Sequence, residues 1–558
     1  MFANPLWRHL TIVALALSMF VPGLATQSAA QTDQSILRVH QWLYPDVVDP
    51  QKSSFTNELD ILAIVYEGLT RLDEHQVTVP AAAESWEYNA DATQITFHLR
   101  AGLTYSDGSP LTAENFRYAV ERTCDPATAG SYQSILFVVA GCAEFAGLTI
   151  DAGGNARAYT AAEHEAARNA LGVRALDDRT LQLDFTRPAP YFHTIAFTWV
   201  FYPVKQAIVE QDPDNWWRSA ENHIGNGPFI VTRIDPDQRW SFAANNHYRL
   251  GRPKLDGLEF VYIGDPAVSL QAYRAGDLDI LHIGAGVIDE IRDDTELAGQ
   301  LLDYPLAGTM MMAMQLTQAP FDDPKVREAF AYAFDRETYC AELEDGTCVP
   351  TLSWIPPGVP GAIETQAFAF DPVKAKQALA ASTYGDPQAL PAITLTYYND
   401  DPREGERAEW VAGQYRDLLG ITMNLAPMDG TTLSSLTKDA ATHPQLMLYG
   451  GWFQDYPDPQ NWLSLYWTCD SVFARPIGYC NPAFDQLVTQ GDTTVDPAER
   501  LPFYEQAGRV LVDDAPGIFL FNAEGLFLVK PTVAGLAPTA SSSDWPGQYA
   551  SLMSIEKS

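Results

Sequence analysis

The sequence predicts an α/β protein of several domains. Its 558 residues are 46% apolar and 19% charged, fractions typical of globular chains and unlike those of disordered, collagenous or coiled-coil chains. At roughly 100–200 residues per domain, this length allows about three domains. Strand patterns and helix patterns alternate along the chain, which favours α/β lobes over a sandwich or a helix bundle.

The first clear strand and helix lie around residue 100. Alternating apolar residues predict a half-buried strand over 95–99. Turn-forming residues follow at 102–110, and Thr112 is placed to cap a helix. The inner face of that helix would consist of Phe116, Ala119 and Val120.

Later elements carry similar start and stop signals. Residues 255–263 predict a strand, and 269–275 predict a helix that Gly276 ends. Further helices are expected after Asp323-Pro324, over 410–419, after Asn481-Pro482 and from Asp496-Pro497 through Val512.

The N-terminus has the pattern of a secretory signal peptide. Arg8 precedes an apolar run over 10–21, Pro22-Gly23 breaks that run, and residues 28–30 (SAA) supply the small residues of a cleavage site. The run is too short for a membrane span. We expect residues 1–30 to be removed and the mature protein to be soluble and periplasmic, although a buried N-terminal helix is the alternative. No cysteine precedes Cys124, so neither a lipid anchor nor direct membrane insertion is expected.

The charge excludes one broad class of partner. Thirty-five basic residues stand against 71 acidic ones, a net charge of -36. A field this negative opposes binding to nucleic acid and to anionic lipid.

The cysteines indicate disulfides. Six cysteines allow 15 pairings, but near neighbours close the shortest loops. We therefore expect the sequential pairs Cys124 with Cys142, Cys340 with Cys348 and Cys469 with Cys480. Free thiols are the alternative. No C-x-x-C spacing occurs, which argues against zinc and against a thioredoxin-like redox motif.

Catalytic motifs are not found. The chain has no G-x-S-x-G elbow and no phosphate-binding G-x-x-x-x-G-K-[ST] loop. His164-Glu165 begins like a zinc-protease helix, but Arg168 stands where the second histidine would be needed. We therefore expect no enzyme activity, no metal and no cofactor. The alternative from a different functional class is an enzyme, such as an exported hydrolase.

Eight stretches, in order, resemble one family, the extracytoplasmic solute-binding proteins of family 5, which serve oligopeptide and dipeptide ABC transporters. The stretches are YEGL at 66–69, AESW at 83–86, TFHLR at 96–100, SDGSPLTAENF at 106–116, GNGPF at 225–229, PKLD at 253–256, AGDLDI at 275–280 and VREAFAYAFDR at 326–336. Each is weak alone, whereas the ordered set covers most of the mature chain.

The resemblance implies a bilobed, periplasmic-binding-protein-like clamshell of type II with an additional domain inserted in lobe I. Lobe I would comprise 31–74, 206–305 and 526–558, the added domain 75–205, and lobe II 306–525. The chain would cross between the lobes near Pro305 and near Ala523, where a hinge is expected.

The implied function is capture of a peptide between two closing lobes and its delivery to the permease subunits of an ABC importer. A monomer is expected. The alternative within the family is another small solute, such as an oligosaccharide or a nickel complex. A sensory role, in which the ligand is passed to a receptor, also fits the sequence.

The segment after the apolar run 446–449 holds the main candidates for ligand binding. In the family, an aspartate here pairs with the α-amino group of the peptide, and Asp455 is the matching residue. Asp458 matches a second, more variable acid. Trp452, Phe453 and Trp462 either wall side-chain pockets or belong to the core.

Two further candidates lie elsewhere. Some members of the family bind the α-carboxylate of a peptide with an arginine in the segment that follows the strand at 393–398 here. The resemblance therefore makes Arg403 a candidate, with Arg407, or a solvated charge at a helix start, as the alternatives; a guanidinium fork is suited to a carboxylate. Tyr44 is a candidate from lobe I.

Overall fold

The computed structural model describes residues 34–147, 149–150, 156–157, 159–284, 286–399, 402–548 and 552–558. The chain divides into two compact units, 1–34 and 35–558. The expected signal peptide, 1–30, lies outside the described residues, and the described helices and strands all belong to the second unit. We searched the described residues for membrane spans, and none of their helices has both the length and the apolar character required.

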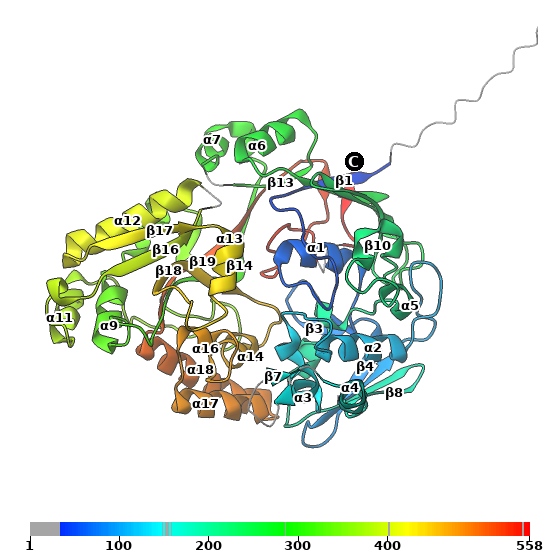
Figure 1. Ribbon diagram of the computed structural model, residues 1–558. Helices are drawn as coiled ribbons and strands as arrows, with labels where there is room; N and C mark the ends of the chain where they lie inside the picture. The colour runs from blue at the N-terminus through cyan, green and yellow to red at the C-terminus, as the bar shows by residue number, and fades with distance from the viewer. Residues whose placement is uncertain are drawn as a thin grey trace, which may run out of the picture. The chain divides into compact units, whose positions relative to one another are not determined.

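One large mixed sheet runs through this unit (Figure 1). Each strand of its main path is hydrogen-bonded to the next one named. The path is β10 (Phe229–Asp235), β11 (Arg239–Ala244), β12 (Gly257–Tyr262), β1 (Ile36–Gln41), β13 (Ile280–His282), β19 (Gly517–Val529), β14 (Leu301–Met314), β18 (Leu446–Phe453), β16 (Ile393–Tyr398) and β17 (Met423–Met428). A short strand, β15 (Cys348–Pro350), also pairs with β19.

Strands β14 and β19 are long and antiparallel, and they contain both expected crossings between the lobes. Pro305 of β14 lies opposite Glu524 of β19, next to Ala523. The register shifts between Pro305 and Thr309, so the ladder is interrupted just beyond this point. The two crossings expected from the resemblance are therefore side by side in one strand pair.

A second sheet lies within the range expected for the added domain. Its strand order is β4 (Ala83–Tyr88), β5 (Gln94–Leu99), β9 (Thr180–Asp184) and β8 (Val173–Asp177). Helix α2 (Ala113–Cys124) packs against β8 and β9. Helices α3 (Cys142–Ala146) and α4 (Ala161–Asn169) and the short strand pair β6 (Thr149–Ile150) with β7 (Ala156–Arg157) also belong to this region. Strand β3 (Thr78–Pro80) of the same range pairs with β2 (Thr70–Leu72), which lies in the range expected for lobe I.

The remaining elements belong to the ranges expected for the two lobes, and we keep lobe I, added domain and lobe II as names for those ranges. Lobe I adds α1 (Thr56–Val65), α5 (Gln206–Val209), α6 (Pro266–Ala275), α7 (Ile288–Asp293), α8 (Thr295–Ala298), β20 (Val533–Ala534) and β21 (Glu556–Lys557). Lobe II adds α9 (Pro324–Ala333), α10 (Arg336–Glu342), α11 (Pro372–Ala381), α12 (Pro402–Leu419), α13 (Gly430–Leu436), α14 (Pro459–Trp462), α15 (Ser464–Trp467), α16 (Ala474–Ile477), α17 (Pro482–Thr493) and α18 (Pro497–Asp514).

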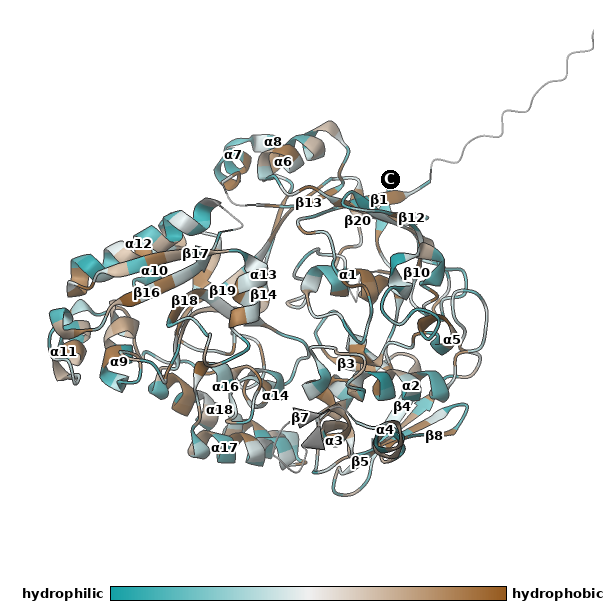
Figure 2. Ribbon diagram, viewed as in Figure 1, coloured by the Kyte–Doolittle hydropathy of each residue, from teal (hydrophilic) through white to brown (hydrophobic). Residues whose placement is uncertain are grey.

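Helix α12 shows how the sheet of lobe II is covered. It lies along β16 and β17 (Figure 1). Hydrophobic and hydrophilic residues both occur along it (Figure 2). Its residues Ala408, Val411 and Tyr415 recur at helical spacing and are completely buried, so one stripe of the helix packs on the sheet.

The predicted elements are present, with two corrections at helix starts. The strands at 95–99 and 255–263 are β5 and β12, and the helices after Thr112, Asp323, Asn481 and Asp496 are α2, α9, α17 and α18. Helix α6 begins at Pro266 instead of 269, because Asp265 caps it by accepting a hydrogen bond from the amide of Val268. Helix α12 begins at Pro402 instead of 410. Both starts were missed although proline at the first helical position is a standard start signal.

The three disulfides join the expected partners. Cys124 pairs with Cys142, Cys340 with Cys348 and Cys469 with Cys480. The first connects α2 to α3, and the second connects α10 to β15.

Apolar residues gather in clusters that follow this division. One cluster combines residues of lobe I, such as Leu37 and Phe260, with residues of the added domain, such as Phe201. Two others, around Phe330 and around Trp467, belong to lobe II. Tyr456 of lobe II packs in the cluster of lobe I and the added domain, so the two lobes touch at this side chain.

Candidate functional site

Strand β18 leads directly into the candidate site. The strand ends at Phe453, and the chain turns before α14 begins at Pro459. Asp458 caps α14 by accepting a hydrogen bond from the amide of Gln460 at 3.0 Å. This cap fixes the end of the turn, so the residues between Phe453 and Asp458 are held between a strand and a helix.

Asp455 is held in place by Asn461. The Nδ2 of Asn461 donates to Oδ2 of Asp455 at 2.9 Å, and the amide of Asp455 donates back to Oδ1 of Asn461 at 3.1 Å. Trp452 Nε1 donates to the same Oδ1 at 3.0 Å. A third neighbour, Tyr132 of the added domain, places its hydroxyl in hydrogen-bond contact with the Asp455 carboxyl group. The carboxyl group is thus oriented by lobe II and covered by the added domain.

Asp455 lines a small cavity between the lobes, of about 50 Å³. Pockets that hold small-molecule ligands usually measure about 300–1,000 Å³, so a peptide requires the lobes to open. Its walls come from lobe II, from Trp199 of the added domain and from lobe I. The lining residues are Thr56, Leu59, Trp199, Ala307, Phe453, Gln454, Asp455, Ala540, Ser541, Ser543 and Gln548.

Phe453 reaches this cavity because of a glycine. Gly308 of β14 lies opposite Phe453 in the strand pair β14–β18. A Cβ atom at Gly308 would lie only 2.4 Å from the Phe453 ring. The absence of a side chain at Gly308 therefore lets the ring lie across β14, where it remains partly exposed at the cavity.

Burial changes the acidity of Asp455. Its removal from water raises the pKa to about 7, although the hydrogen bonds from Asn461 and Tyr132 act in the opposite direction. No lysine, arginine or histidine of the described residues forms an ion pair with it. A cationic group entering the cavity would therefore meet a carboxyl group that has no ion-pair partner among the described residues.

Direct contacts hold the lobes together around the cavity. The amide of Ala307 in lobe II donates to the carbonyl of Ala540 in lobe I at 2.8 Å. Gln454 Nε2 donates to Oε1 of Gln76 and to Oγ of Ser541, both at 3.3 Å. Farther away, Arg187 of the added domain forms an ion pair with Asp492 of lobe II at 3.2 Å. The cavity is closed by polar contacts that opening would expose to water.

Three of the residues predicted in this segment lie in the core of lobe II. Asp458 is buried and forms a two-pronged ion pair with Arg500, at 2.7 and 3.0 Å, which gives it a structural partner. Trp462 is completely buried against Trp354. Trp452 is 7% exposed. The two tryptophans thus follow the core alternative, while Asp455 and Phe453 line the cavity.

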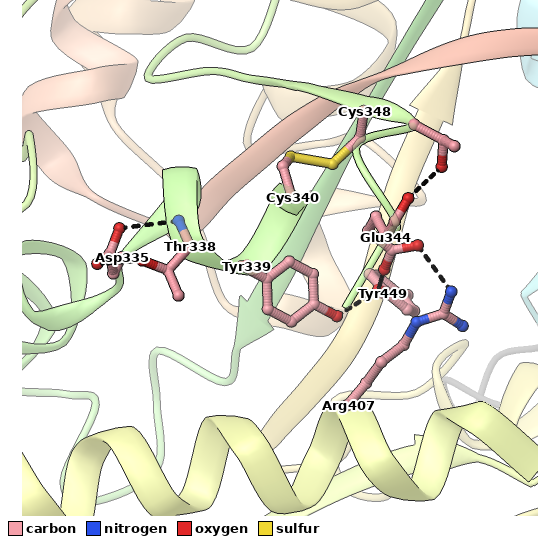
Figure 3. The surroundings of a disulfide bond; sticks show 9 residues. Asp335, Thr338, Tyr339, Cys340, Glu344, Cys348, Arg407 and Tyr449 are labelled. Carbon is pink, nitrogen blue, oxygen red and sulfur yellow. Dashed lines mark hydrogen bonds and ion pairs between the residues drawn. A yellow bond between two sulfur atoms is a disulfide. The ribbon is translucent and has the colours of Figure 1, made fainter. Parts of the chain in front are cut away.

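Arg403 and Arg407 lie on α12 and both have acidic partners in the loop after α10. Arg403 pairs with Asp345 at 2.6 Å. Arg407 pairs with Glu344 at 2.7 Å and with Glu404 at 2.8 Å, beside the Cys340–Cys348 disulfide (Figure 3). Neither arginine lines the cavity at Asp455. Binding of a carboxylate here would require one of these pairs to exchange.

Tyr44 lies in lobe I and away from the cavity lining. Its hydroxyl accepts a hydrogen bond from Trp240 Nε1 at 3.2 Å, and its ring stands edge-on to Tyr262 at 4.9 Å. These contacts place it in the structural network of lobe I.

Sequence reasoning missed most of the cavity wall. Asn461 lies within the same turn as Asp455, and an amide six residues after a candidate acid is a signal that was available. Tyr132, Trp199, Ser541 and Gln548 come from distant parts of the chain, and only the fold brings them to Asp455.

Comparison with known proteins supports this architecture. Residues 77–473 match the model of the bacterial extracellular solute-binding proteins, family 5. A dipeptide-binding protein of Bacillus subtilis, DppE, is 26% identical over 517 residues, 91% of this chain and 90% of its own length. A probable deoxycholate-binding periplasmic protein of Escherichia coli, YgiS, is 28% identical over 513 residues, 90% of each chain.

A solved structure agrees with the fold. The Escherichia coli murein tripeptide binding protein MppA superposes with a TM-score of 0.79 and 25% identity, over 94% of this chain and 99% of that one. Members of the family bind solutes, and their bilobed fold is the fold of this chain. Because the family model matches well over half of its length, the chain belongs to the bacterial extracellular solute-binding proteins of family 5.

Proposed function

We propose that this protein is an exported, periplasmic binding protein that captures peptides between its two lobes and delivers them to the permease of an ABC importer. The observation that carries the proposal is Asp455, a carboxyl group that lines an interlobe cavity and has no ion-pair partner among the described residues. The names of the relatives, which bind dipeptides and murein tripeptides, support peptide as the cargo.

The α-ammonium group of a peptide supplies the missing charge. When it reaches Asp455, the carboxyl group ionises, since an adjacent positive charge favours the carboxylate. The ion pair forms where little water competes, so it contributes more than it would at the surface. Asn461 keeps the carboxylate aimed at the cavity while the lobes open and close.

Phe453 is the second contact that we propose within the site. Its ring is partly exposed beside Asp455 and is carried by the last residue of β18. A peptide bound by its ammonium group would place its first side chain near this ring. The site therefore combines one charged contact with an apolar surface.

The domain organisation completes the proposal. We propose lobe I, the added domain and lobe II at the expected ranges, with opening about the strand pair β14–β19. Export with removal of residues 1–30, and delivery to permease subunits by a monomer, follow from the same assignment. The interlobe carboxyl group can form an ion pair with the ammonium group of a peptide, whereas an anionic cargo such as deoxycholate gains no ion pair from it.

Two measurements test the cargo. Small molecules released from the purified, denatured protein are identified by mass spectrometry, and a mixture of short peptides is expected. Calorimetric titration of the cargo-free protein with Ala-Ala-Ala should then give binding that Asp455→Asn weakens by about 30-fold or more, which corresponds to ~2 kcal/mol.

Matched controls separate the ion pair from general damage. Asp417→Asn removes an exposed carboxylate of lobe II and should leave binding unchanged. N-acetyl-Ala-Ala-Ala lacks the ammonium charge and should bind the wild type as poorly as Ala-Ala-Ala binds the Asp455 variant. Release of a single sugar, or equal binding of the acetylated peptide, would show that the proposal is wrong.

A further inference from the structure

The cavity at Asp455 has two more carboxyl groups behind its lobe I wall. Asp60 lies on α1, one turn after the lining residue Thr56, and is completely buried. Asp544 directly follows the lining residue Ser543, and the side chain of Thr56 hydrogen-bonds to it. The two aspartates are near enough for the charge of Asp544 to act on Asp60. Lobe I thus places two acidic groups next to its lining residues Thr56 and Ser543, although neither acid lines the cavity itself.

These acids have polar contacts but no positive partner. Gln41 Nε2 donates to Oδ2 of Asp60 at 3.2 Å, whereas Oδ1 of Asp60 has no hydrogen-bond partner in the described structure. The hydroxyl of Ser543 donates to Asp544 at 3.4 Å. No lysine, arginine or histidine among the described residues is ion-paired with either acid.

Two buried acids elsewhere in the protein each have a positively charged partner. Asp49 of lobe I is paired with Arg122 through two hydrogen bonds of 2.5 Å. Asp458 of lobe II is paired with Arg500. Since an unpaired buried carboxylate is costly, proteins usually supply such a partner. The acids around the Asp455 cavity lack one, and burial raises the pKa of Asp544 to about 6 and that of Asp60 well above its usual range.

A separate group points to the same missing ligand. Gln548 lines the cavity and is only 2% exposed. Its Oε1 is buried and accepts no hydrogen bond from the described residues. An unsatisfied buried acceptor on a side chain that lines the cavity favours a ligand that donates hydrogen bonds, and an ammonium or guanidinium group carries several donors.

We infer that the site selects peptides whose first residue is lysine or arginine. This inference rests on the proposed function, because it places the α-ammonium group at Asp455. The side-chain cation of the same residue then lies toward the lobe I wall, where Gln548 accepts its hydrogen bond and Asp60 and Asp544 supply the opposite charge. The closing of the lobes removes water from between these charges and strengthens their attraction.

The test compares peptides that differ only in this second charge. The cargo-free, full-length protein is titrated calorimetrically with Lys-Ala-Ala, with norleucine-Ala-Ala, which has the apolar chain without the charge, and with Glu-Ala-Ala. Lys-Ala-Ala is expected to bind about tenfold or more tightly than the norleucine peptide, and Glu-Ala-Ala most weakly.

Variants then assign the preference to the lobe I acids. Asp544→Asn and, separately, Asp60→Asn should bring the ratio of lysine to norleucine affinity close to one while the norleucine peptide still binds. Asp46→Asn, which changes an exposed acid of the same lobe, should keep the wild-type ratio. The wild-type ratio is decisive even where a buried variant fails to fold.

The possible failures are distinct. If all three peptides bind the wild type equally well, the inference of a basic first residue is wrong while the proposed function stands. If none of them binds, the proposed function itself is contradicted. A lysine preference that both aspartate variants retain would place the second charge elsewhere and overturn the inference.

Discussion

At the scale of single residues, the protein treats its buried acids in two ways. Asp458 receives a guanidinium partner and acts as a helix cap. Asp455, only three residues earlier, is hydrogen-bonded by an amide and a tyrosine hydroxyl, and in the described part of the chain it has no positively charged partner. The first arrangement stabilises the folded chain in every state. The second leaves an unpaired carboxyl group whose ionisation is costly until a positively charged ligand binds. The turn after β18 therefore contains one acid that stabilises the fold and one that is available to a ligand.

The acidity of Asp455 predicts how stability depends on pH. Its pKa rises from an ordinary 3.8 to about 7 on burial, so the folded protein holds a proton between these values and the unfolded chain does not. The contribution of this group to stability is therefore fully present below its ordinary pKa of 3.8 and falls as the pH rises toward 7, by about 1.4 kcal/mol per unit. Asp544 acts in the same direction.

Thermal melting of cargo-free protein at pH 5 and pH 8 measures this effect. The wild type should lose stability at pH 8, and Asp455→Asn should lose about 1–3 kcal/mol less, since it never has to bury a charge. Asp417→Asn, at an exposed site, should follow the wild type. Equal losses in wild type and Asp455→Asn would contradict the assignment of a buried, proton-binding carboxyl group.

At the scale of elements, the loop from α10 to β15 organises one side of lobe II (Figure 3). The disulfide between Cys340 and Cys348 closes it, and β15 pairs with β19. Glu344 within the loop accepts a hydrogen bond from the hydroxyl of Tyr449 and pairs with Arg407. The loop thereby ties β18, β19 and α12 together.

Opening this disulfide should destabilise lobe II. For a loop of 8 residues, the chain-entropy relation gives about 2.5 kcal/mol. The double variant Cys340→Ser/Cys348→Ser should show this loss in denaturant unfolding, and dithiothreitol should then produce a smaller further shift than it does in the wild type. A variant as stable as the wild type would mean that the contacts of Glu344 hold the loop without the covalent bond.

Helix and strand positions were largely predictable because local signals repeat. Asp-Pro and Asn-Pro starts marked α9, α17 and α18, and alternation marked β5. The start of α12 was predicted eight residues late, since its first turns, over 402–409, are mostly polar and lack the apolar stripe that begins near Trp410. Long β14 was not recognised, and its pairing with β19 depends on residues more than two hundred positions apart.

The site was predictable only where it lies within one segment. Asp455 was proposed because it matches the family's aspartate in this segment, and Phe453 because it follows the apolar run 446–449. The nearby tryptophans lie in the same aromatic segment and were candidates for the same reason. Trp462, however, packs against Trp354, and no local sequence pattern predicts this contact. Gln548 and Asp544 reach the cavity from the C-terminal part of the chain. Their contribution is a property of tertiary structure.

At the scale of the whole folded unit, contacts across the lobes decide how easily the site opens. Arg187 of the added domain meets Asp492 of lobe II, whose side chain is only 2% exposed. Tyr456 of lobe II packs among residues of lobe I and the added domain. Each of these contacts is lost if the lobes separate, so each favours the closed state and, through it, ligand retention.

Removing one such contact should weaken binding without touching the ligand. Arg187→Gln is expected to lower peptide affinity about three- to tenfold, since a partly exposed ion pair contributes on the order of 1 kcal/mol. Small-angle X-ray scattering should show a larger radius of gyration at subsaturating peptide. Arg174→Gln, which removes a similarly exposed pair with Asp184 inside the added domain, should change neither quantity. An unchanged affinity for Arg187→Gln would mean that this pair has no part in closure.

The position of β19 in the main sheet has a consequence for biosynthesis. Strand β19, residues 517–529, lies between β13 and β14 in the sheet, and it is the last long strand to be synthesised. In a nascent chain that ends before β19, strands β13 and β14 each have an unpaired edge, and no strand connects the two parts of the sheet. Such exposed edges make the chain a target for proteases and for aggregation. The main sheet can therefore form in full only after β19 has been synthesised.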